Sequence, residues 1–210
     1  MIKKLLDKIS SATDEEQKIV LLDPAALADS RSEPDLRTIG MFCDVSEDKV
    51  AEIIHAMLYL NEINRLEKSS ENKKPIDFYI STYGGSADDM FALYDIMRTI
   101  RQESEIHTLG LGKVMSAGVL LLAGGTKGKR RIAKNCRVMI HSVAAGNHGN
   151  LQDLTNELEA IQDLQDMYTS CLAAETNMTE GDIKEMLNRN VNVYLSATEA
   201  VQLGIADIIV

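Results

Sequence analysis

The sequence predicts an α/β fold, because short runs of strand-forming residues alternate with helical patterns along most of the chain. Residues 76–81 are a compact run rich in strand formers, and they lead into the glycine pair Gly84-Gly85. Apolar residues at helical spacing follow at once. The same order of strand, glycine and helix recurs between residues 106–112 and a helix that we expect to start at Ser116.

The first expected elements lie between residues 38 and 74. Residues 38–42 predict a short strand, and Ser46 is a suitable N-cap for the helix that follows. The apolar positions of this helix recur at helical spacing, at Val50, Ile53, Ile54, Met57 and Leu58. The polar stretch 67–74 ends at Pro75 and predicts a loop.

The next helix follows the glycine pair. Ser86 and Asp89 have the spacing of a capping box. Apolar residues at helical spacing predict its buried face, at Met90, Leu93, Tyr94, Met97 and Ile100. Strands are then expected at residues 131–133 and 137–141.

A long amphipathic helix is expected over residues 150–176. Its apolar side holds Leu151, Leu154, Leu158, Ile161, Leu164, Met167, Tyr168, Cys171 and Leu172. Acidic residues occupy the other side. The helix is longer than one small core needs, so it predicts contact between subunits. Two shorter helices are expected next, capped by Thr179 and by Ser196, and Gly204 ends the second of them. A closing strand is expected at residues 205–210.

Composition limits the architecture and the partners. A chain of 210 residues with 45% hydrophobic residues can bury one good core, which we expect over residues 37–210. Residues 1–36 are polar, contain Pro24 and Pro34, and predict a loosely ordered N-terminal arm. The net charge of −10 disfavours nucleic acid as a partner. Residues 127–131 are locally basic, and we expect them to form a solvated turn or a subunit contact.

Nothing in the sequence indicates export or membrane insertion. No apolar run is long enough to span a bilayer, and residues 1–18 lack the uninterrupted apolar segment of a signal peptide. Cys43, Cys136 and Cys171 fit neither a disulfide framework nor a zinc site, and predict buried free thiols. A cytoplasmic location is therefore expected.

Ser116, His141 and the Gly84-Gly85 pair are the candidates for chemistry. Ser116 stands at the expected start of an apolar helix, where it could be a nucleophile or simply a small residue for close packing. His141 ends an expected strand, and could be a base or a structural histidine. The glycine pair could form a plain turn or present a backbone N–H to a ligand. Neither a P-loop nor a G-x-G-x-x-G pattern occurs, which disfavours phosphate binding.

These motifs in this order resemble the proteolytic subunit of the Clp protease (ClpP) family over nearly all of residues 37–210. The matching segments are Tyr83-Gly84-Gly85, Ser116-Ala117-Gly118 and residues 127–130, 135–141 and 194–207. The resemblance implies a ClpP/crotonase-like α/β fold of repeated β-β-α units. In this fold the helix at about 150–176 is a protruding handle.

The resemblance also implies roles at the site. The family's nucleophilic serine matches Ser116, and its histidine base matches His141. The family's oxyanion donors fall on the backbone N–H groups of Gly85 and Ala117. Ala117 stands where the family often has methionine, so the pocket beside the nucleophile is expected to be wider.

The third member of the family's triad, an aspartate, is replaced. Counting back from Tyr194 places it at Asn192, the preferred candidate, and counting from the preceding helix places it at Asn190. An amide oxygen can orient the imidazole but brings no charge to stabilise imidazolium. If neither asparagine takes part, the site is a Ser116–His141 dyad.

The resemblance implies the proteolytic subunit of an ATP-dependent, compartmentalised serine protease that cleaves unfolded polypeptides to short peptides. Its partners would be further copies in two stacked seven-membered rings, a tetradecamer, and a hexameric AAA+ unfoldase. No metal, organic cofactor, nucleic acid or membrane is implied. One alternative is a weakly active or inactive structural or regulatory subunit of a mixed ring. Another is enoyl-hydratase-like chemistry on the same fold, which fits a serine–histidine pair poorly.

Overall fold

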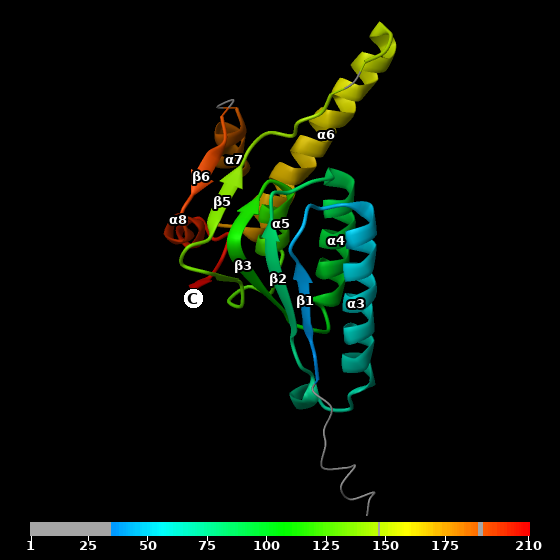
Figure 1. Ribbon diagram of the computed structural model, residues 1–210, viewed down its shortest axis with the longest axis vertical. Helices are drawn as coiled ribbons and strands as arrows, with labels where there is room; N and C mark the ends of the chain where they lie inside the picture. The colour runs from blue at the N-terminus through cyan, green and yellow to red at the C-terminus, as the bar shows by residue number, and fades with distance from the viewer. Residues whose placement is uncertain (1–34, 147, 189–190) are drawn as a thin grey trace, which may run out of the picture. The chain divides into compact units, whose positions relative to one another are not determined.

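The computed structural model describes residues 35–146, 148–188 and 191–210, of which Arg37–Val210 belong to one compact unit (Figure 1). Within these residues, seven strands form a single sheet. The expected arm, residues 1–36, lies almost wholly outside the described residues, so its boundary with the domain stays a prediction.

Most of the sheet is parallel. Its main path is β1 (Thr38–Met41), β2 (Ile76–Thr82), β3 (Ile106–Met115), β4 (Arg131–Ile132) and β7 (Ile208–Ile209), with all neighbours parallel. β5 (Arg137–Ile140) runs parallel to the end of β3, and β6 (Val193–Leu195) is antiparallel to β5. This mixed α/β architecture confirms the expected fold class.

Helices connect the parallel strands. α3 (Glu47–Leu66) joins β1 to β2, α4 (Ala87–Ile100) joins β2 to β3, and α5 (Ala117–Ala123) follows β3. Crossovers between parallel strands are right-handed, and these strands are neighbours in chain order, so the helices lie on one face of the sheet. Figure 1 shows α3 and α4 side by side there, and burial alternates along β2 as a one-sided cover requires.

The remaining elements are a short 3₁₀ helix η1 (Ser70–Asn72) and the helices α6 (Leu151–Glu175), α7 (Glu180–Leu187) and α8 (Ala197–Gln202). Thr179 and Ser196 form complete capping boxes with Asp182 and Glu199, as the sequence predicts. The closing strand is shorter than expected. The strand β6 is not predicted by the sequence.

Core packing follows the apolar pattern closely in α4 and less closely in α3. All five residues predicted for the buried face of α4 are buried. In α3 the prediction is wrong for Leu58, which is 44% exposed. Asn64 is buried instead, where its Oδ1 accepts a hydrogen bond from Nη2 of Arg37 at 2.9 Å.

The helix α6 has two different halves. Its C-terminal half buries Tyr168 and Leu172 against the domain, whereas Leu151 and Leu158 in the N-terminal half are 83% and 56% exposed. Figure 1 shows this half extending beyond the sheet. The apolar side predicted for the helix therefore has no partner over its first turns within the described chain. None of the helices in the described residues has the length and apolar character needed to cross a bilayer.

The C-terminal end of α6 is held by a buried cluster of charged groups. The Glu175 carboxylate accepts hydrogen bonds from Arg101 Nη1 at 3.0 Å, from Arg101 Nη2 at 2.5 Å and from the Tyr94 hydroxyl at 2.9 Å. Burial works against the charge of Glu175, but the hydrogen bonds and charge of Arg101 outweigh it and lower the pKa of Glu175 below its ordinary value. Burial, together with the charge of Glu175, raises the pKa of Tyr94.

The basic stretch at residues 127–131 belongs to the same region. Nη1 of Arg130 donates to the backbone oxygen of Glu175 at 2.6 Å, and its Nη2 pairs with Asp207 at 2.5 Å. Lys127 Nζ donates to the backbone oxygen of Ala174 at 3.0 Å. Arg130 is buried, so the expectation of a solvated turn or a subunit contact is wrong for it. These cations fix the end of a helix.

The cysteines are free, but they are not all buried. Cys136 is buried, and burial raises its pKa to about 11. Cys43 is exposed, so the expectation of a buried thiol is wrong for this residue.

Candidate active site

Ser116 and His141 follow the ends of two neighbouring parallel strands. Ser116 comes directly after β3 and His141 directly after β5, and the two strands pair with Met115 opposite Met139. The backbone N–H of Ser116 donates to the oxygen of Met139 at 2.8 Å, which ties the two strand ends together. The carboxyl ends of parallel strands meet at one edge of a sheet, where α/β proteins place their ligands.

The backbone at Ser116 is strained. Its φ of 53° and ψ of −123° make it the single non-glycine residue with positive φ in the described part of the chain. Such a conformation costs about 1–3 kcal/mol and occurs preferentially at functional sites. Ser116 is the N-cap residue of α5, yet its side chain makes no capping hydrogen bond. The hydroxyl is therefore left for chemistry.

The glycine pair forms a turn that lies against Ser116. Gly84 has φ +106°, and a Cβ on it would stand 2.6 Å from the Cβ of Ser116. Gly85 has φ +150°, and a Cβ on it would stand 2.1 Å from the oxygen of Val45. Both positions therefore require glycine because the backbone of the turn touches its neighbours. If the glycine pair only reversed the chain direction, its close contact with Ser116 would have no explanation.

Two backbone N–H groups at the site are unpaired. Within the described residues, neither the N–H of Gly85 nor that of Ala117 donates a hydrogen bond, although both residues line the same pocket as Ser116 and His141. The N–H of Ala117 is free because Ala117 is the first residue of α5. Unpaired N–H groups beside a hydroxyl can stabilise an oxyanion.

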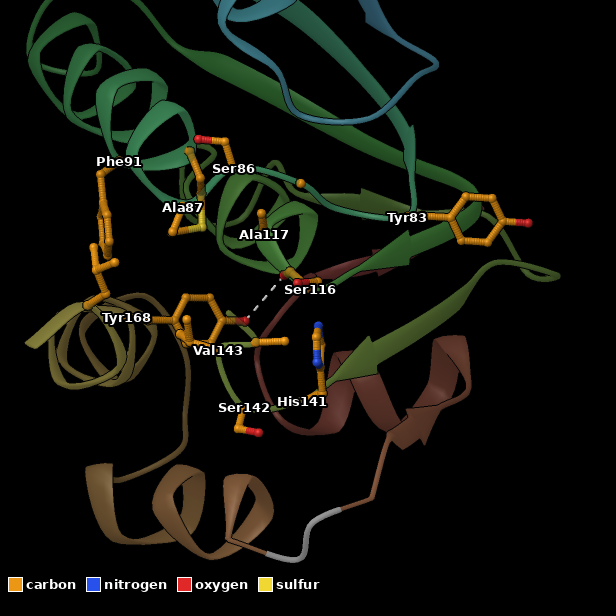
Figure 2. Close-up of a pocket in the computed structure, with 14 residues that line it drawn as sticks. Tyr83, Ser86, Ala87, Phe91, Ser116, Ala117, His141, Ser142, Val143 and Tyr168 are labelled. Atoms are coloured by element: carbon orange, nitrogen blue, oxygen red, sulfur yellow. Dashed lines mark hydrogen bonds between the residues drawn. The ribbon is translucent and has the colours of Figure 1, made fainter. Parts of the chain in front are cut away.

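His141 lies across the pocket from Ser116. Figure 2 shows its ring directed toward the serine, and its side chain is half-buried. No hydrogen bond joins the two side chains among the described residues. Such contacts are often long before substrate binds, so this geometry is compatible with proton transfer.

Asn192 stands at the edge of this arrangement. β5 and β6 pair with Ile140 opposite Val193, so the next pair in the same register would be His141 and Asn192. The side chain of Asn192 is exposed and does not line the pocket. Asn190, the other candidate, lies outside the described residues. No carboxylate lines this pocket in the described part of the chain.

The pocket has a volume of about 400 Å³ and mainly apolar walls. Ala87, Met90 and Phe91 come from α4, and Leu164 and Tyr168 come from α6. Figure 2 labels Ala87, Phe91 and Tyr168 among them. An apolar pocket beside the serine can hold an apolar side chain of a substrate. Over the residues described, no cluster of histidine, cysteine, aspartate or glutamate could hold a metal ion.

Tyr168 is a site residue that the sequence does not reveal. Its hydroxyl donates to the backbone oxygen of Ser116 at 3.4 Å, and burial raises its pKa (Figure 2). The sequence places Tyr168 on the apolar side of a helix, and nothing in its spacing links it to a serine 52 residues away.

A serine, a histidine and two unpaired N–H groups around one pocket are the parts that a serine hydrolase uses. The sequence profile of the Clp protease family matches residues 34–210. The chain is 31% identical over 173 residues to the ATP-dependent Clp protease proteolytic subunit 1 of Prochlorococcus marinus (strain MIT 9312), covering 82% of this chain and 83% of that protein. It is 32% identical over 172 residues to the protein of the same name from Thermobifida fusca (strain YX), covering 81% of this chain and 72% of that protein.

The chain therefore belongs to the Clp protease family, a family of serine peptidases. This membership confirms the resemblance predicted from the sequence. The family match and the two relatives do not favour either alternative considered above, an inactive subunit or a hydratase.

Proposed function

We propose that the chain is the proteolytic subunit of an ATP-dependent protease, in which Ser116 is the nucleophile and His141 the general base. The observation that carries this proposal is the pocket that Ser116 and His141 share with the unpaired N–H groups of Gly85 and Ala117. The names of the two relatives support the reaction class.

The proposed reaction is peptide-bond hydrolysis through an acyl-enzyme. Ser116 Oγ attacks the peptide carbonyl while His141 takes the hydroxyl proton. The carbonyl oxygen becomes an oxyanion and accepts hydrogen bonds from the N–H groups of Gly85 and Ala117. Each such donor contributes about 3 kcal/mol to transition-state stabilisation in a serine protease. The C–N bond then breaks, His141 protonates the leaving amine, and water hydrolyses the ester through the same histidine.

The third role is assigned to Asn192. Its amide oxygen would accept the N–H on the far side of the His141 ring and hold one tautomer. The register of β5 and β6 supports this assignment, because one further pair after Ile140 and Val193 would bring Asn192 opposite His141. An amide gives no charge stabilisation to imidazolium, so we expect slower acylation than with a carboxylate.

The proposed particle consists of two stacked seven-membered rings of this chain in the cytoplasm, served by a hexameric AAA+ unfoldase. The exposed apolar residues in the first turns of α6 support ring stacking through this helix, because two copies can cover each other's leucines. The sequence has no nucleotide-binding motif, so the partner would use the ATP and deliver unfolded polypeptide.

A fluorophosphonate probe tests the proposed nucleophile. We expect the probe to label the wild type and the Ser170→Ala variant, which loses an exposed serine of α6, but not the Ser116→Ala variant. Hydrolysis of a fluorogenic peptide should follow the same pattern. If the correctly assembled wild type shows neither labelling nor hydrolysis, the chain is a structural subunit and the proposal is wrong.

A further inference from the structure

The two expected oxyanion donors belong to two peptide units, and both units are held in the same way. The N–H of Ala117 is in one unit with the carbonyl of Ser116, and the N–H of Gly85 is in one unit with the carbonyl of Gly84. A peptide unit is planar and trans, so its C=O and its N–H point in opposite directions. Fixing the carbonyl on one side therefore aims the N–H on the other.

The Ser116–Ala117 unit is held at its carbonyl by two donors. The N–H of Val119 donates to the oxygen of Ser116 at 3.0 Å, a 3₁₀-type bond at the start of α5. The hydroxyl of Tyr168 donates to the same oxygen at 3.4 Å. The Tyr168 phenol is protonated at neutral pH, and burial raises its pKa further, so the hydroxyl is a donor.

The Gly84–Gly85 unit has the matching pair of donors. The N–H of Val45 donates to the oxygen of Gly84 at 2.7 Å. The hydroxyl of Thr82, which is buried, donates to the same oxygen at 3.4 Å and accepts from the N–H of Gly84 at 3.0 Å, so it holds Gly84 at both its oxygen and its nitrogen. In each of the two peptide units, the carbonyl accepts hydrogen bonds from one backbone N–H and one buried hydroxyl, and the N–H at the other side of the unit is the expected oxyanion donor.

We propose that Tyr168 and Thr82 are positioning residues of the oxyanion hole, an inference that rests on the proposed function. Each hydroxyl fixes the orientation of a carbonyl by a hydrogen bond, and so directs the N–H of the same peptide unit into the pocket. A hydrogen bond to the carbonyl also polarises the amide, which makes its N–H a stronger donor. We expect the hydrogen bond of Tyr168 to matter more than that of Thr82, because the peptide unit that it holds includes Ser116, whose backbone is strained.

The test uses variants that remove each hydroxyl and keep the shape of the side chain, Tyr168→Phe and Thr82→Val. Matched controls are Tyr94→Phe, whose buried hydroxyl donates to Glu175, and Thr108→Val, whose buried hydroxyl donates to the oxygen of Leu122. Each control loses a buried hydrogen bond away from the pocket, in Tyr94→Phe to a carboxylate and in Thr108→Val to a backbone oxygen. Kinetics of peptide hydrolysis are measured on assembled particles of all five proteins.

We expect kcat to fall about tenfold in Tyr168→Phe and in Thr82→Val with KM unchanged, which is less than the 10²–10³-fold loss when a donor itself is removed. Affinity for a peptide aldehyde, whose adduct with the serine carries the oxyanion, should weaken about as much as kcat falls. Affinity for a cleaved product peptide should stay the same. Both controls should keep the wild-type kcat.

Three results would overturn the inference. The first is an unchanged kcat in both Tyr168→Phe and Thr82→Val. The second is an equal loss of kcat in the controls, and the third is an affinity for the product peptide that weakens as much as the affinity for the aldehyde. The last two would show that the variants loosen the protein in general. A wild type that hydrolyses the peptide while Ser116→Ala does not separates these results from a failure of the proposed function.

Discussion

Gly84 and Ser116 touch so closely that a Cβ on Gly84 would stand 2.6 Å from the Cβ of Ser116 and 3.0 Å from the backbone oxygen of Met115. The turn after β2 is therefore in direct contact with the residue that follows β3. This contact places the N–H of Gly85 and the hydroxyl of Ser116 at the same pocket.

The contact predicts a large effect for Gly84→Ala. A side chain here meets backbone and the Ser116 Cβ, and it also has to adopt φ +106°. Gly128→Ala is the matched control, because Gly128 has φ +83° but nothing within 4 Å of its Cβ position. We expect the control to lose about 1–2 kcal/mol of stability from backbone strain, and Gly84→Ala to lose about 2 kcal/mol more from overpacking.

Thermal unfolding of the two variants measures this difference, and peptide hydrolysis should be lost only in Gly84→Ala. Equal melting temperatures in the two variants would show that the turn can move away from Ser116.

The fold could be predicted where one apolar pattern dominates an element. α4 has a single stripe, and each predicted residue is buried. α3 has more apolar positions than its buried face can take, so packing decides between Leu58, which is exposed, and Leu60, which is buried. β6 has only three residues, too few for an alternating pattern to be recognised.

The site could be predicted only in part, for a similar reason. Ser116, His141 and Gly85 stand at strand and helix ends, where sequence patterns are informative, and they do line one pocket. Tyr168 contacts the backbone oxygen of Ser116, which is 52 residues away in the sequence. Arg130 contacts the backbone oxygen of Glu175, which is 45 residues away. Contacts of this kind depend on how the helices pack, which no local pattern contains.

A second prediction concerns the asparagine. Asn192→Asp should raise kcat for peptide hydrolysis at least about tenfold, since the reverse change in a serine protease costs about 10⁴-fold. The gain arises because a carboxylate both orients the His141 ring and stabilises its charged form. Steady-state kinetics on assembled particles measures it.

Asn190→Asp is the comparison for this prediction. If it raises kcat and Asn192→Asp does not, the orienting position is Asn190. If neither variant gains activity, the site works as a Ser116–His141 dyad.

A third prediction concerns ring stacking through α6. Leu158→Glu and Ile161→Glu should convert double rings into single rings, because each puts a charge into the apolar face that we propose the rings share. Gln152→Glu adds the same charge at an exposed position about 120° around the helix from Leu158 and about 180° from Ile161, and should leave the particle intact. Sedimentation velocity distinguishes the two particle sizes. Double rings in all three variants would exclude this face from stacking.

A fourth prediction concerns pH and the base of α6. The pKa of Glu175 is lower in the folded protein than its ordinary value of 4.5, so its pairing with Arg101 adds stability above that pH. The stability is lost as pH falls through the lower, folded pKa. Glu175→Gln should therefore destabilise the protein by about 3 kcal/mol at pH 7, as breaking a buried pair does.

The difference between wild type and Glu175→Gln should shrink as the pH falls below 4.5, the ordinary pKa of the carboxyl. Melting temperatures from pH 7 down to pH 3 measure this. Glu180→Gln, which changes an exposed carboxylate in α7, should follow the wild type at every pH. A constant gap between wild type and Glu175→Gln would contradict the assigned protonation.

The sequence of α6 contains six acidic residues and no basic one, and in the described chain Asp166 and Glu175 pair with cations outside the helix, Lys184 and Arg101. Two copies brought together along this helix therefore repel one another at the margins of their leucine contact. Mobile counterions weaken such repulsion, over a distance of about 10 Å at 0.1 M salt. The proposed double ring should consequently become more stable as potassium chloride is added, so the ionic strength would determine what fraction of the rings stay paired around a closed peptidase chamber.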